Sequence, residues 1–109
     1  KEGIPGIPMD GALTLSENVA DQGAASCVTE IVAGLEDPDF KTLYKSMANC
    51  WAATASREYC QYAAQADVHS TEKLRVNRVV VNCDEFYEAF DIEEGDGMWV
   101  APEDRVHIW

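Results

Sequence analysis

The sequence predicts a mainly α-helical domain, and three observations support that prediction. Thr14 followed three residues later by Glu17 has the form of a helix-capping box. The four prolines lie outside the segments that have helical periodicity. Between residues 40 and 51, apolar side chains recur at the spacing of one helix face. These side chains are Phe40, Leu43, Tyr44, Met47, Ala48 and Trp51.

Length and charge limit the classes of protein to which the chain can belong. Its 109 residues suffice for one domain, and 47% of them are hydrophobic. A domain of this size removes about two-thirds of its unfolded surface from solvent. The formal net charge of −12 repels nucleic acids and anionic membranes, and the chain has no apolar run of about 18 residues. We therefore expect neither nucleic-acid binding nor direct membrane contact.

The chain is predicted to begin with an extended lead-in over residues 1–13, followed by a helix that runs from Thr14 to near Gly34. The lead-in contains three glycines and two prolines without periodicity. At about 100° per residue, one stripe of the helix carries two carboxylates together with apolar side chains. We expect this stripe to face the core. Its members are Glu17, Asp21, Ala24, Val28, Ile31 and Leu35.

The remaining elements are predicted to be short. Further helices are expected over residues 40–51, 56–65 and 84–90. The last of these is expected to be capped by Asn82 or Cys83. Before it, the valine-rich stretch LRVNRVVVN is predicted to be a short strand or an extended crossing. The tail from residue 93 is predicted to be irregular, with Pro102 opening a turn and aromatic residues packed against the helices.

The four cysteines do not form a recognised metal-binding or redox motif. They are Cys27, Cys50, Cys60 and Cys83, at separations of 23, 10 and 23 residues. An even number permits two disulfides in three pairings. Three of the four fall in segments predicted to be helical, where a free cysteine packs as a small hydrophobic residue. We therefore expect reduced, buried thiols and no structural zinc site.

Four charged or titratable residues are candidates for function as well as for structure. A capping box alone explains Glu17, whereas Asp21 has no capping duty and needs a cation, a hydrogen-bond donor or a metal. His69 lies in the connection DVHS, where a surface position is the simple interpretation. Arg75 lies in the apolar context LRV, where an arginine usually pairs with a carboxylate. His107, near the end of the chain, is expected at the surface.

Several common functional motifs are missing from the sequence. There is no G-x-S-x-G, no phosphate-binding glycine loop and no H-E-x-x-H. The acidic stretch DIEEGDG lacks the alternating oxygen ligands of a calcium loop. Local motifs of these kinds therefore assign no reaction to the chain.

Four longer stretches carry a more specific signal. They read TLSENVADQGA, MANCWAATASREY, DVHSTEKLRVN and NCDEFYEAFDIEEGDGMWVAPEDRVHIW. In this order and spacing they resemble the C-terminal part of the neprilysin family of zinc metallopeptidases, which includes endothelin-converting enzymes and bacterial oligoendopeptidases of the O type. The resemblance runs from about Leu13 to Trp109, the position of a similar final tryptophan in the family. It implies that residues 14–109 form the C-terminal helical subdomain of a zincin-like (thermolysin-like) catalytic domain.

The resemblance implies a role for each residue that matches a family motif. Glu17 matches the third protein ligand of the catalytic zinc, beside two histidines of an H-E-x-x-H helix. Asp21 matches the aspartate that holds one of those histidines through its other ring nitrogen. His69 matches the donor to the oxyanion of the tetrahedral intermediate, and Arg75 the group that binds a substrate carbonyl. Asp67, two residues before His69, is expected to orient it.

The H-E-x-x-H helix precedes the E-N-x-x-D motif in the family and does not occur in this sequence. We therefore expect the chain to be the C-terminal fragment of a larger peptidase, inactive alone and without the zinc ion of the complete enzyme. The implied partners are an oligopeptide substrate and the N-terminal part of the same enzyme. In the fragment, the face that carries Glu17 and Asp21 is expected to be open or covered by a neighbouring copy, and Asp21 is expected to lack a partner.

Two other interpretations remain open from the sequence. The chain could be a stand-alone acidic helical module that binds another protein, with Glu17 as a cap and His69 at the surface. It could also be a non-catalytic relative, which only the upstream sequence would reveal. The cysteines do not match those of the animal extracellular enzymes, which favours a bacterial origin. A cytoplasmic location is then favoured over secretion or the cell surface.

Overall fold

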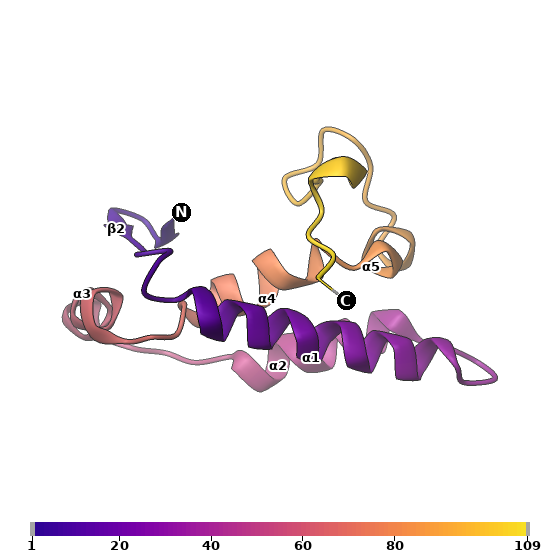
Figure 1. Cartoon of the computed structure of the whole chain (residues 1–109), viewed down its shortest axis with the longest axis horizontal. Helices are drawn as coiled ribbons and strands as arrows, with labels where there is room; N and C mark the ends of the chain where they lie inside the picture. The colour runs from indigo at the N-terminus through magenta and orange to yellow at the C-terminus, as the bar shows by residue number, and fades with distance from the viewer. Residues whose placement is uncertain (1, 109) are drawn as a thin grey trace.

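The structure is a computed structural model that describes residues 2–108, so Lys1 and Trp109 lie outside the described residues. The predicted mainly α-helical class is confirmed (Figure 1). None of the described helices combines the length and apolar character that a bilayer span requires. The helices are α1 (Leu15–Ala33), α2 (Phe40–Trp51), α3 (Arg57–Ala66), α4 (Glu72–Val80) and α5 (Asp84–Ala89). The other elements are strands β1 (Glu2–Ile4) and β2 (Ile7–Pro8) and the 3₁₀-helix η1 (Pro102–Asp104).

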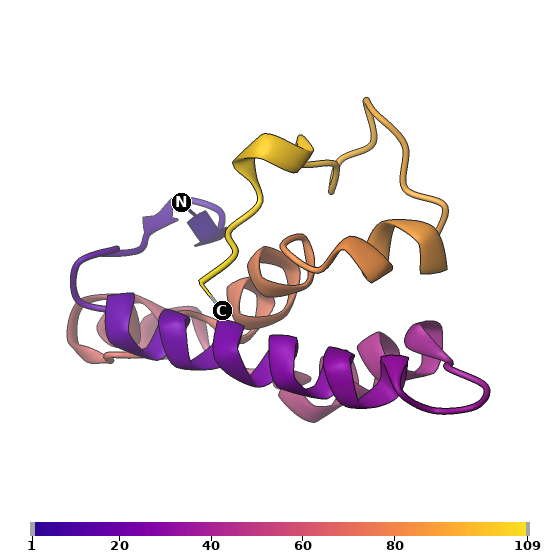
Figure 2. The same cartoon turned by 45° about the vertical axis from the view of Figure 1, so that its right-hand side comes forward.

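Three helices form the body of the molecule. The longest, α1, runs along the long axis, and α2 and α4 pack against it and against each other (Figures 1 and 2). Helix α5 packs on α2. The antiparallel hairpin β1–β2 occupies the expected lead-in and contacts α3 and α4. The hairpin and α3 therefore lie at one end of α1, and the tail lies on the side of α4 and α5 (Figure 2).

The hydrophobic core lies where α1, α2, α4 and α5 meet. Tyr44 and Phe86 meet edge to face with 5.9 Å between ring centroids, and Phe86 meets Tyr87 in the same way at 5.5 Å. Val79 and Val80, at the C-terminal end of α4, are buried in this cluster. The buried members are Ala25, Tyr44, Val79, Val80, Val81, Cys83, Phe86 and Tyr87. The N-terminal halves of α1 and α4 are thus left outside the core.

The tail is irregular apart from η1 and is attached to the core through aromatic contacts. Trp99 packs edge to face on Tyr87 at 5.5 Å, which confirms the expected packing for this aromatic residue. The guanidinium of Arg105 lies 3.6 Å from the Tyr87 ring centroid and donates to Asp84 at 2.9 Å. Trp109, the final aromatic residue of the tail, lies outside the described residues.

The predicted inward stripe of α1 is wrong. The buried residues of α1 are Gln22, Ala25 and Thr29, whereas Ile31 and Leu35 of the predicted stripe are 64% and 57% exposed. The buried face carries one small side chain and two polar side chains, and both polar ones are hydrogen-bonded to other parts of the chain. Gln22 accepts a hydrogen bond from Asn82 at 2.9 Å, and the hydroxyls of Thr29 and Tyr44 are 3.0 Å apart. A prediction from hydrophobicity alone therefore selects a face of α1 that is not the one the helix buries.

The predicted capping box of Thr14 and Glu17 is also wrong. Thr14 has a helical backbone conformation and its side chain makes no capping hydrogen bond. The turn before α1 is closed by Asp10 instead, whose Oδ1 accepts from the amides of Ala12 at 2.9 Å and Leu13 at 3.2 Å. Glu17 is therefore not needed as a cap and its carboxylate points elsewhere.

Helix α4 replaces the strand or extended crossing predicted for LRVNRVVVN. Val76, Val79 and Val80 follow the i, i+3, i+4 spacing of a helix face and pack into or against the core. Glu72 in the first turn and Arg78 in the last turn complement the helix dipole. The burial that this packing provides outweighs the preference of valine for strands, which depends strongly on context.

The cysteines are free thiols, but only Cys83 is buried. Cys27 and Cys50 are exposed and Cys60 is half-buried. The expectation of buried thiols is therefore wrong for Cys27 and Cys50, because α1 and α2 present different faces to the core than a general preference of cysteine for the interior suggests.

Asp39, the cap of α2, makes stability depend on pH. Hydrogen bonds from the Thr42 hydroxyl at 2.7 Å and the Thr42 amide at 3.0 Å lower the pKa of Asp39. The ionised Asp39 carboxylate therefore stabilises the folded chain fully above the pKa of about 3.9 that this group has in the unfolded chain. This stabilisation is lost as the pH falls through the lower pKa of Asp39 in the folded chain. We expect Asp39→Asn to be less stable than the wild type at pH 7 and the difference to shrink in acid. Urea unfolding at both pH values measures this, and a difference independent of pH would contradict it.

Candidate functional site

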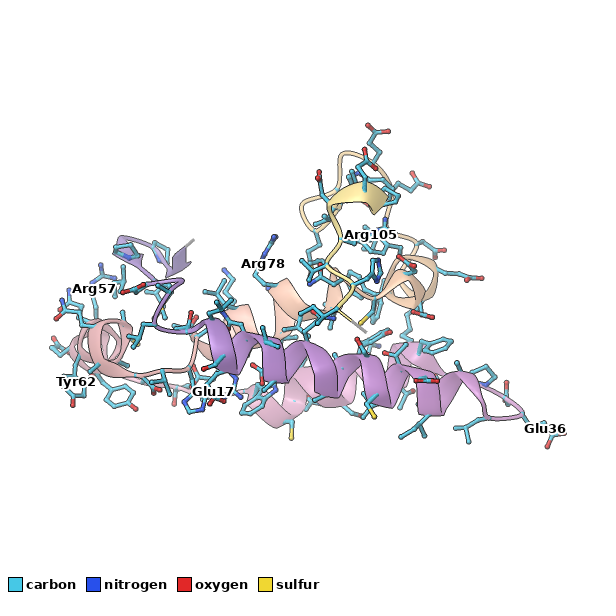
Figure 3. All side chains as sticks on the ribbon, in the orientation of Figure 1. Glu17, Glu36, Arg57, Tyr62, Arg78 and Arg105 are labelled. Atoms are coloured by element: carbon cyan, nitrogen blue, oxygen red, sulfur yellow. The ribbon has the colours of Figure 1, made fainter. Side chains whose placement is uncertain are left out.

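The candidate site lies at the end of α1 nearest α3. It combines the N-terminal half of α1, the connection of residues 67–71 between α3 and α4, and the start of α4. Figure 3 labels Glu17 at this end of α1, far from Arg105 in the tail. Because α4 packs along α1, residues more than 50 positions apart in the sequence come into contact here.

His69 lies between two carboxylates. Its Nδ1 is 2.8 Å from Asp67 Oδ1, and its Nε2 is 3.4 Å from Glu17 Oε2. The side chains of His69 and Glu17 are 41% and 38% exposed, so both remain accessible from solvent. With Nδ1 facing Asp67, the ring presents Nε2 outward toward Glu17.

Asp67 holds both the ring and the backbone of His69. Its Oδ1 accepts from the His69 amide at 2.9 Å as well as contacting Nδ1. The hydrogen bond from the backbone amide, followed by that from the ring, lowers the pKa of Asp67. This carboxylate is therefore ionised at neutral pH and available as a fixed acceptor. This arrangement depends only on local sequence, because a single residue lies between Asp67 and His69.

Asp21 and Arg75 form a bidentate ion pair, with Arg75 Nε and Nη2 each 2.8 Å from an Asp21 oxygen. The two side chains are 14% and 15% exposed. The hydrogen bond that Arg75 donates to the Asp21 carboxylate raises the pKa of Arg75, which stays a cation. The expectation that Asp21 lacks a partner is therefore wrong, since α4 brings Arg75 to it. The prediction that Arg75 pairs with a carboxylate is confirmed, and that carboxylate belongs to Asp21.

Trp51 is a member of the site that the sequence reading placed only in the apolar face of α2. Its ring centroid lies 3.8 Å from the Arg75 guanidinium carbon. Arg75 is thus held by Asp21 in the plane of its guanidinium and by Trp51 against its face. The sequence held no signal for this role, because the helical periodicity of residues 40–51 already accounts for Trp51 as an apolar residue.

A zinc site needs more ligands than this group provides. Catalytic zinc takes three protein ligands and a water, and residues 2–108 contain no group of three or more His, Cys, Asp or Glu that could hold a metal ion. The accessible carboxylate of Glu17 fits the donor chemistry of one such ligand. His107 is exposed in the tail and is not part of the site.

Loss of the Asp21–Arg75 pair is expected to destabilise the chain. Asp21→Asn leaves the Arg75 guanidinium partly buried beside a neutral amide. We expect the free energy of unfolding to fall by about 3 kcal/mol, which is near the low end for a broken buried ion pair because both side chains keep some exposure. Glu17→Gln on the same helix is the matched control and should change stability by less than about 1 kcal/mol. Urea unfolding of each variant measures both. A double variant Asp21→Asn/Arg75→Met less stable than Asp21→Asn would contradict this account.

Comparison with known proteins places this chain in a family. Peptidase family M13 matches residues 3–106. The neutral endopeptidase of Lactococcus lactis subsp. lactis (strain IL1403) is 41% identical over 102 residues, which are 94% of this chain and 16% of that protein. The neutral endopeptidase of Lactobacillus helveticus is 38% identical over 93% of this chain and 16% of that protein.

A more distant relative shows similar coverage. Human neprilysin is 26% identical over 117 residues, 95% of this chain and 15% of that protein. The chain thus spans 16% of the length of the first curated relatives it matches. No solved structure matches it. The chain belongs to peptidase family M13, the metallopeptidase family of the neutral endopeptidases and neprilysin.

Proposed function

We propose that the chain supplies part of the active site of a zinc-dependent metalloendopeptidase that cleaves peptide bonds in oligopeptides. Glu17 would be the third protein ligand, completing a pair of histidines from an H-E-x-x-H helix that is not in this sequence. Zinc held in this way lowers the pKa of its bound water toward neutrality and polarises the scissile carbonyl. By itself the chain would hold no catalytic zinc and would be inactive.

One observation carries this proposal. Glu17, Asp21, His69 and Arg75 come from two separate parts of the sequence and meet at one end of α1, within direct contact distance in two pairs. The Glu17–His69 pair is open to solvent, since each side chain is about two-fifths exposed, whereas Asp21 and Arg75 are only 14% and 15% exposed and Trp51 lies over the guanidinium. A site that is half formed and open on one side fits a function completed by another part of the polypeptide.

His69 is suited to stabilise negative charge on a substrate. Asp67 holds its ring at Nδ1, so its other nitrogen, Nε2, is directed outward. When the imidazole is protonated, Nε2–H can donate to the carbonyl oxygen on which charge develops during attack. A donor fixed in advance in this way lowers the barrier without reorganisation.

Arg75 is suited to orient a peptide. Two of its N–H donors are used by Asp21, and a guanidinium has five, so others remain for a substrate carbonyl oxygen. The contacts with Asp21 and Trp51 hold the group in one orientation before substrate arrives. Such preorganisation fixes the peptide in line for attack. Asp21 could in addition orient a zinc-bound histidine, with Arg75 as its second partner.

The proposed partners are the oligopeptide substrate and the remaining part of the same enzyme. Ile31 on α1 and Leu35, two residues beyond the end of that helix, belong to the sequence stripe of Glu17 and Asp21 and are exposed. An interface along this stripe would cover these apolar side chains and bring the missing zinc ligands to Glu17. Nucleic acid remains an unsuitable partner because the net charge is −12.

A chimera tests the proposal. The chain would replace the matching 102 residues of the Lactococcus lactis neutral endopeptidase. We expect the chimera to bind one zinc ion and to hydrolyse an internally quenched peptide in a manner abolished by a chelator, whereas the 109-residue chain alone does neither. The Lactococcus protein without its own segment is the control and should be inactive.

The same chimera distinguishes the rival interpretation. Exposed apolar residues also suit a stand-alone module that binds another protein, as Tyr62 on α3 is 68% exposed (Figure 3). A folded chimera that lacks both zinc and hydrolysis, while the unaltered Lactococcus enzyme has both, would reject the peptidase role and favour that module.

A further inference from the structure

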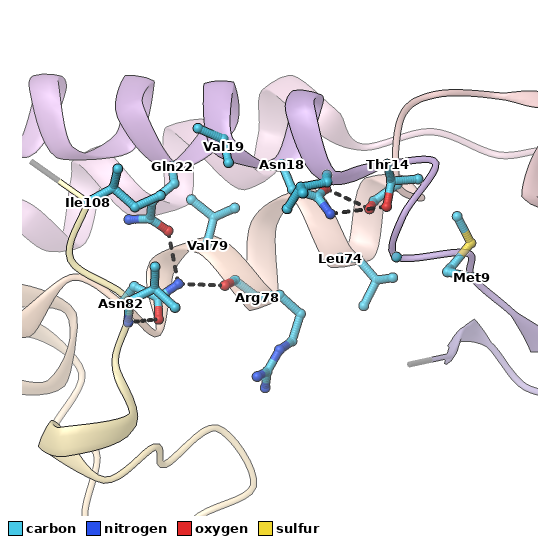
Figure 4. A pocket seen from close by; sticks show the side chains of 14 residues that line it. Met9, Thr14, Asn18, Val19, Gln22, Leu74, Arg78, Val79, Asn82 and Ile108 are labelled. Carbon is cyan, nitrogen blue, oxygen red and sulfur yellow. Dashed lines mark hydrogen bonds between the residues drawn. The ribbon is translucent and has the colours of Figure 1, made fainter.

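Asn18, which follows Glu17 in the sequence, makes side-chain hydrogen bonds in two directions. Its Oδ1 accepts from Ser70 Oγ at 2.7 Å, and its Nδ2 donates to Thr14 Oγ1 at 3.1 Å. Thr14 Oγ1 donates in turn to the backbone carbonyl of Asp10 at 3.0 Å. Figure 4 shows the dashed line that joins Asn18 to Thr14 at the start of α1. The three bonds connect the entry of α1 to the connection of residues 67–71.

The network determines which way the Asn18 amide faces. The Asp10 carbonyl can only accept, so the single hydroxyl proton of Thr14 is directed to it. Thr14 Oγ1 can then only accept from Asn18, which places Nδ2 on that side and Oδ1 toward Ser70. All three bonds point the same way, so each strengthens the next. Thr14 is 1% exposed, which gives the chain of bonds a rigid anchor.

Asn18 provides the firmest side-chain link between α1 and the connection that carries His69. The other link, from His69 to Glu17, is longer at 3.4 Å and joins two partly exposed groups, which makes it worth little. Asp67 orients the imidazole but lies in the same connection, so it does not position that connection on α1. The neighbouring hydroxyl of Thr71 is buried and has no hydrogen-bond partner among the described residues.

We propose that Asn18 is a positioning residue that holds the connection of residues 67–71 on α1 and so sets the separation between His69 and Glu17. Its catalytic consequence rests on the proposed function. If the Glu17 carboxylate binds a metal ion, it can no longer contact His69. The hydrogen bond between Ser70 and Asn18 then has to keep the connection of residues 67–71 in place on α1. The bond itself is a property of this chain and can be tested without activity.

The first test measures amide hydrogen exchange in the 109-residue chain. Ser70→Ala removes the donor while leaving the bond from Asn18 to Thr14 in place. We expect exchange of the His69 amide to become about fivefold faster, the factor for losing one net hydrogen bond, with the amides of α2 unchanged. Ser70→Thr keeps the hydroxyl and should restore slow exchange. Ser46→Ala, on an exposed position of α2, is the matched control.

A double-mutant cycle shows whether the two residues act together. Asn18→Ala should accelerate exchange at His69 as Ser70→Ala does, and the double variant should add nothing further, because both changes remove the same bond. Additive effects, or unchanged exchange in Ser70→Ala, would overturn the proposed link between α1 and the connection.

The second test measures kinetics in the Lactococcus chimera. Ser70→Ala should lower kcat about tenfold, less than the roughly 100-fold that a 1 Å misplacement costs, with KM and zinc content unchanged and activity recovered in Ser70→Thr. Faster exchange without any change in kcat would overturn the positioning role and leave the proposed function intact. An inactive unaltered chimera would reject the proposed function instead, and the exchange data would still decide the bond.

Discussion

Glu17→Gln is expected to abolish both zinc binding and peptide hydrolysis in the chimera. A neutral amide oxygen is a poorer zinc ligand than a carboxylate. Loss of the Glu17 carboxylate should lower activity by at least about 100-fold, because losing a residue that only hydrogen-bonds to a metal ligand already costs up to that factor. The change should hardly affect folding, because Glu17 makes one long contact with a partly exposed histidine. Zinc content by mass spectrometry and hydrolysis of a quenched peptide measure the two effects.

A matched control separates the ligand role from general charge effects. Glu30 lies on the same helix and is exposed, so Glu30→Gln removes the same charge without touching the site and should leave zinc content and activity unchanged. Retention of stoichiometric zinc together with full hydrolysis in Glu17→Gln would reject Glu17 as a ligand.

His69→Ala is expected to lower kcat of the chimera by about 10²- to 10³-fold, the usual cost of removing one donor to a developing oxyanion. KM should change little, because the interaction strengthens only in the transition state. Zinc content should be retained, since His69 is not proposed as a ligand. Steady-state kinetics with zinc analysis of the same sample gives all three quantities.

The second histidine of the chain is the control for this change. His107 is exposed in the tail, and His107→Ala should leave kcat and KM at their starting values. A His69→Ala chimera with zinc bound and kcat unchanged would remove His69 from the transition state. If zinc is lost as well, His69 acts on the metal ion instead of on the oxyanion.

The sequence predicted helix α2 well and α4 poorly, and the reason is physical. Large apolar side chains such as Phe40, Tyr44 and Trp51 define one face so clearly that periodicity alone locates α2. In α4, the strand preference of valine predicts a strand although the valines lie at helical spacing. Only their burial between α1 and α2 makes the helix the better solution.

The orientation of α1 shows a different limit of sequence reasoning. Its buried face carries Gln22, Ala25 and Thr29, which no hydrophobicity pattern would select. The two polar members are tolerated because Asn82 and Tyr44 satisfy them. Such partners come from other parts of the chain, Tyr44 from α2 and Asn82 from the turn between α4 and α5, so the face that a helix buries depends on contacts that its own sequence does not specify.

The amino-acid sequence by itself determined the mainly helical class and, through four motifs in order, the family. Those features depend on local spacing, which a chain carries before it folds. The tertiary structure decided which groups meet: Asp21 with Arg75, Arg75 with Trp51, and Asn18 with Ser70. Each of these pairs joins separate elements and exists only because α1, α2 and α4 pack side by side. The motif of residues 17–21 therefore supplies Glu17, Asn18 and Asp21, and the packing of the chain brings His69, Ser70 and Arg75 to them.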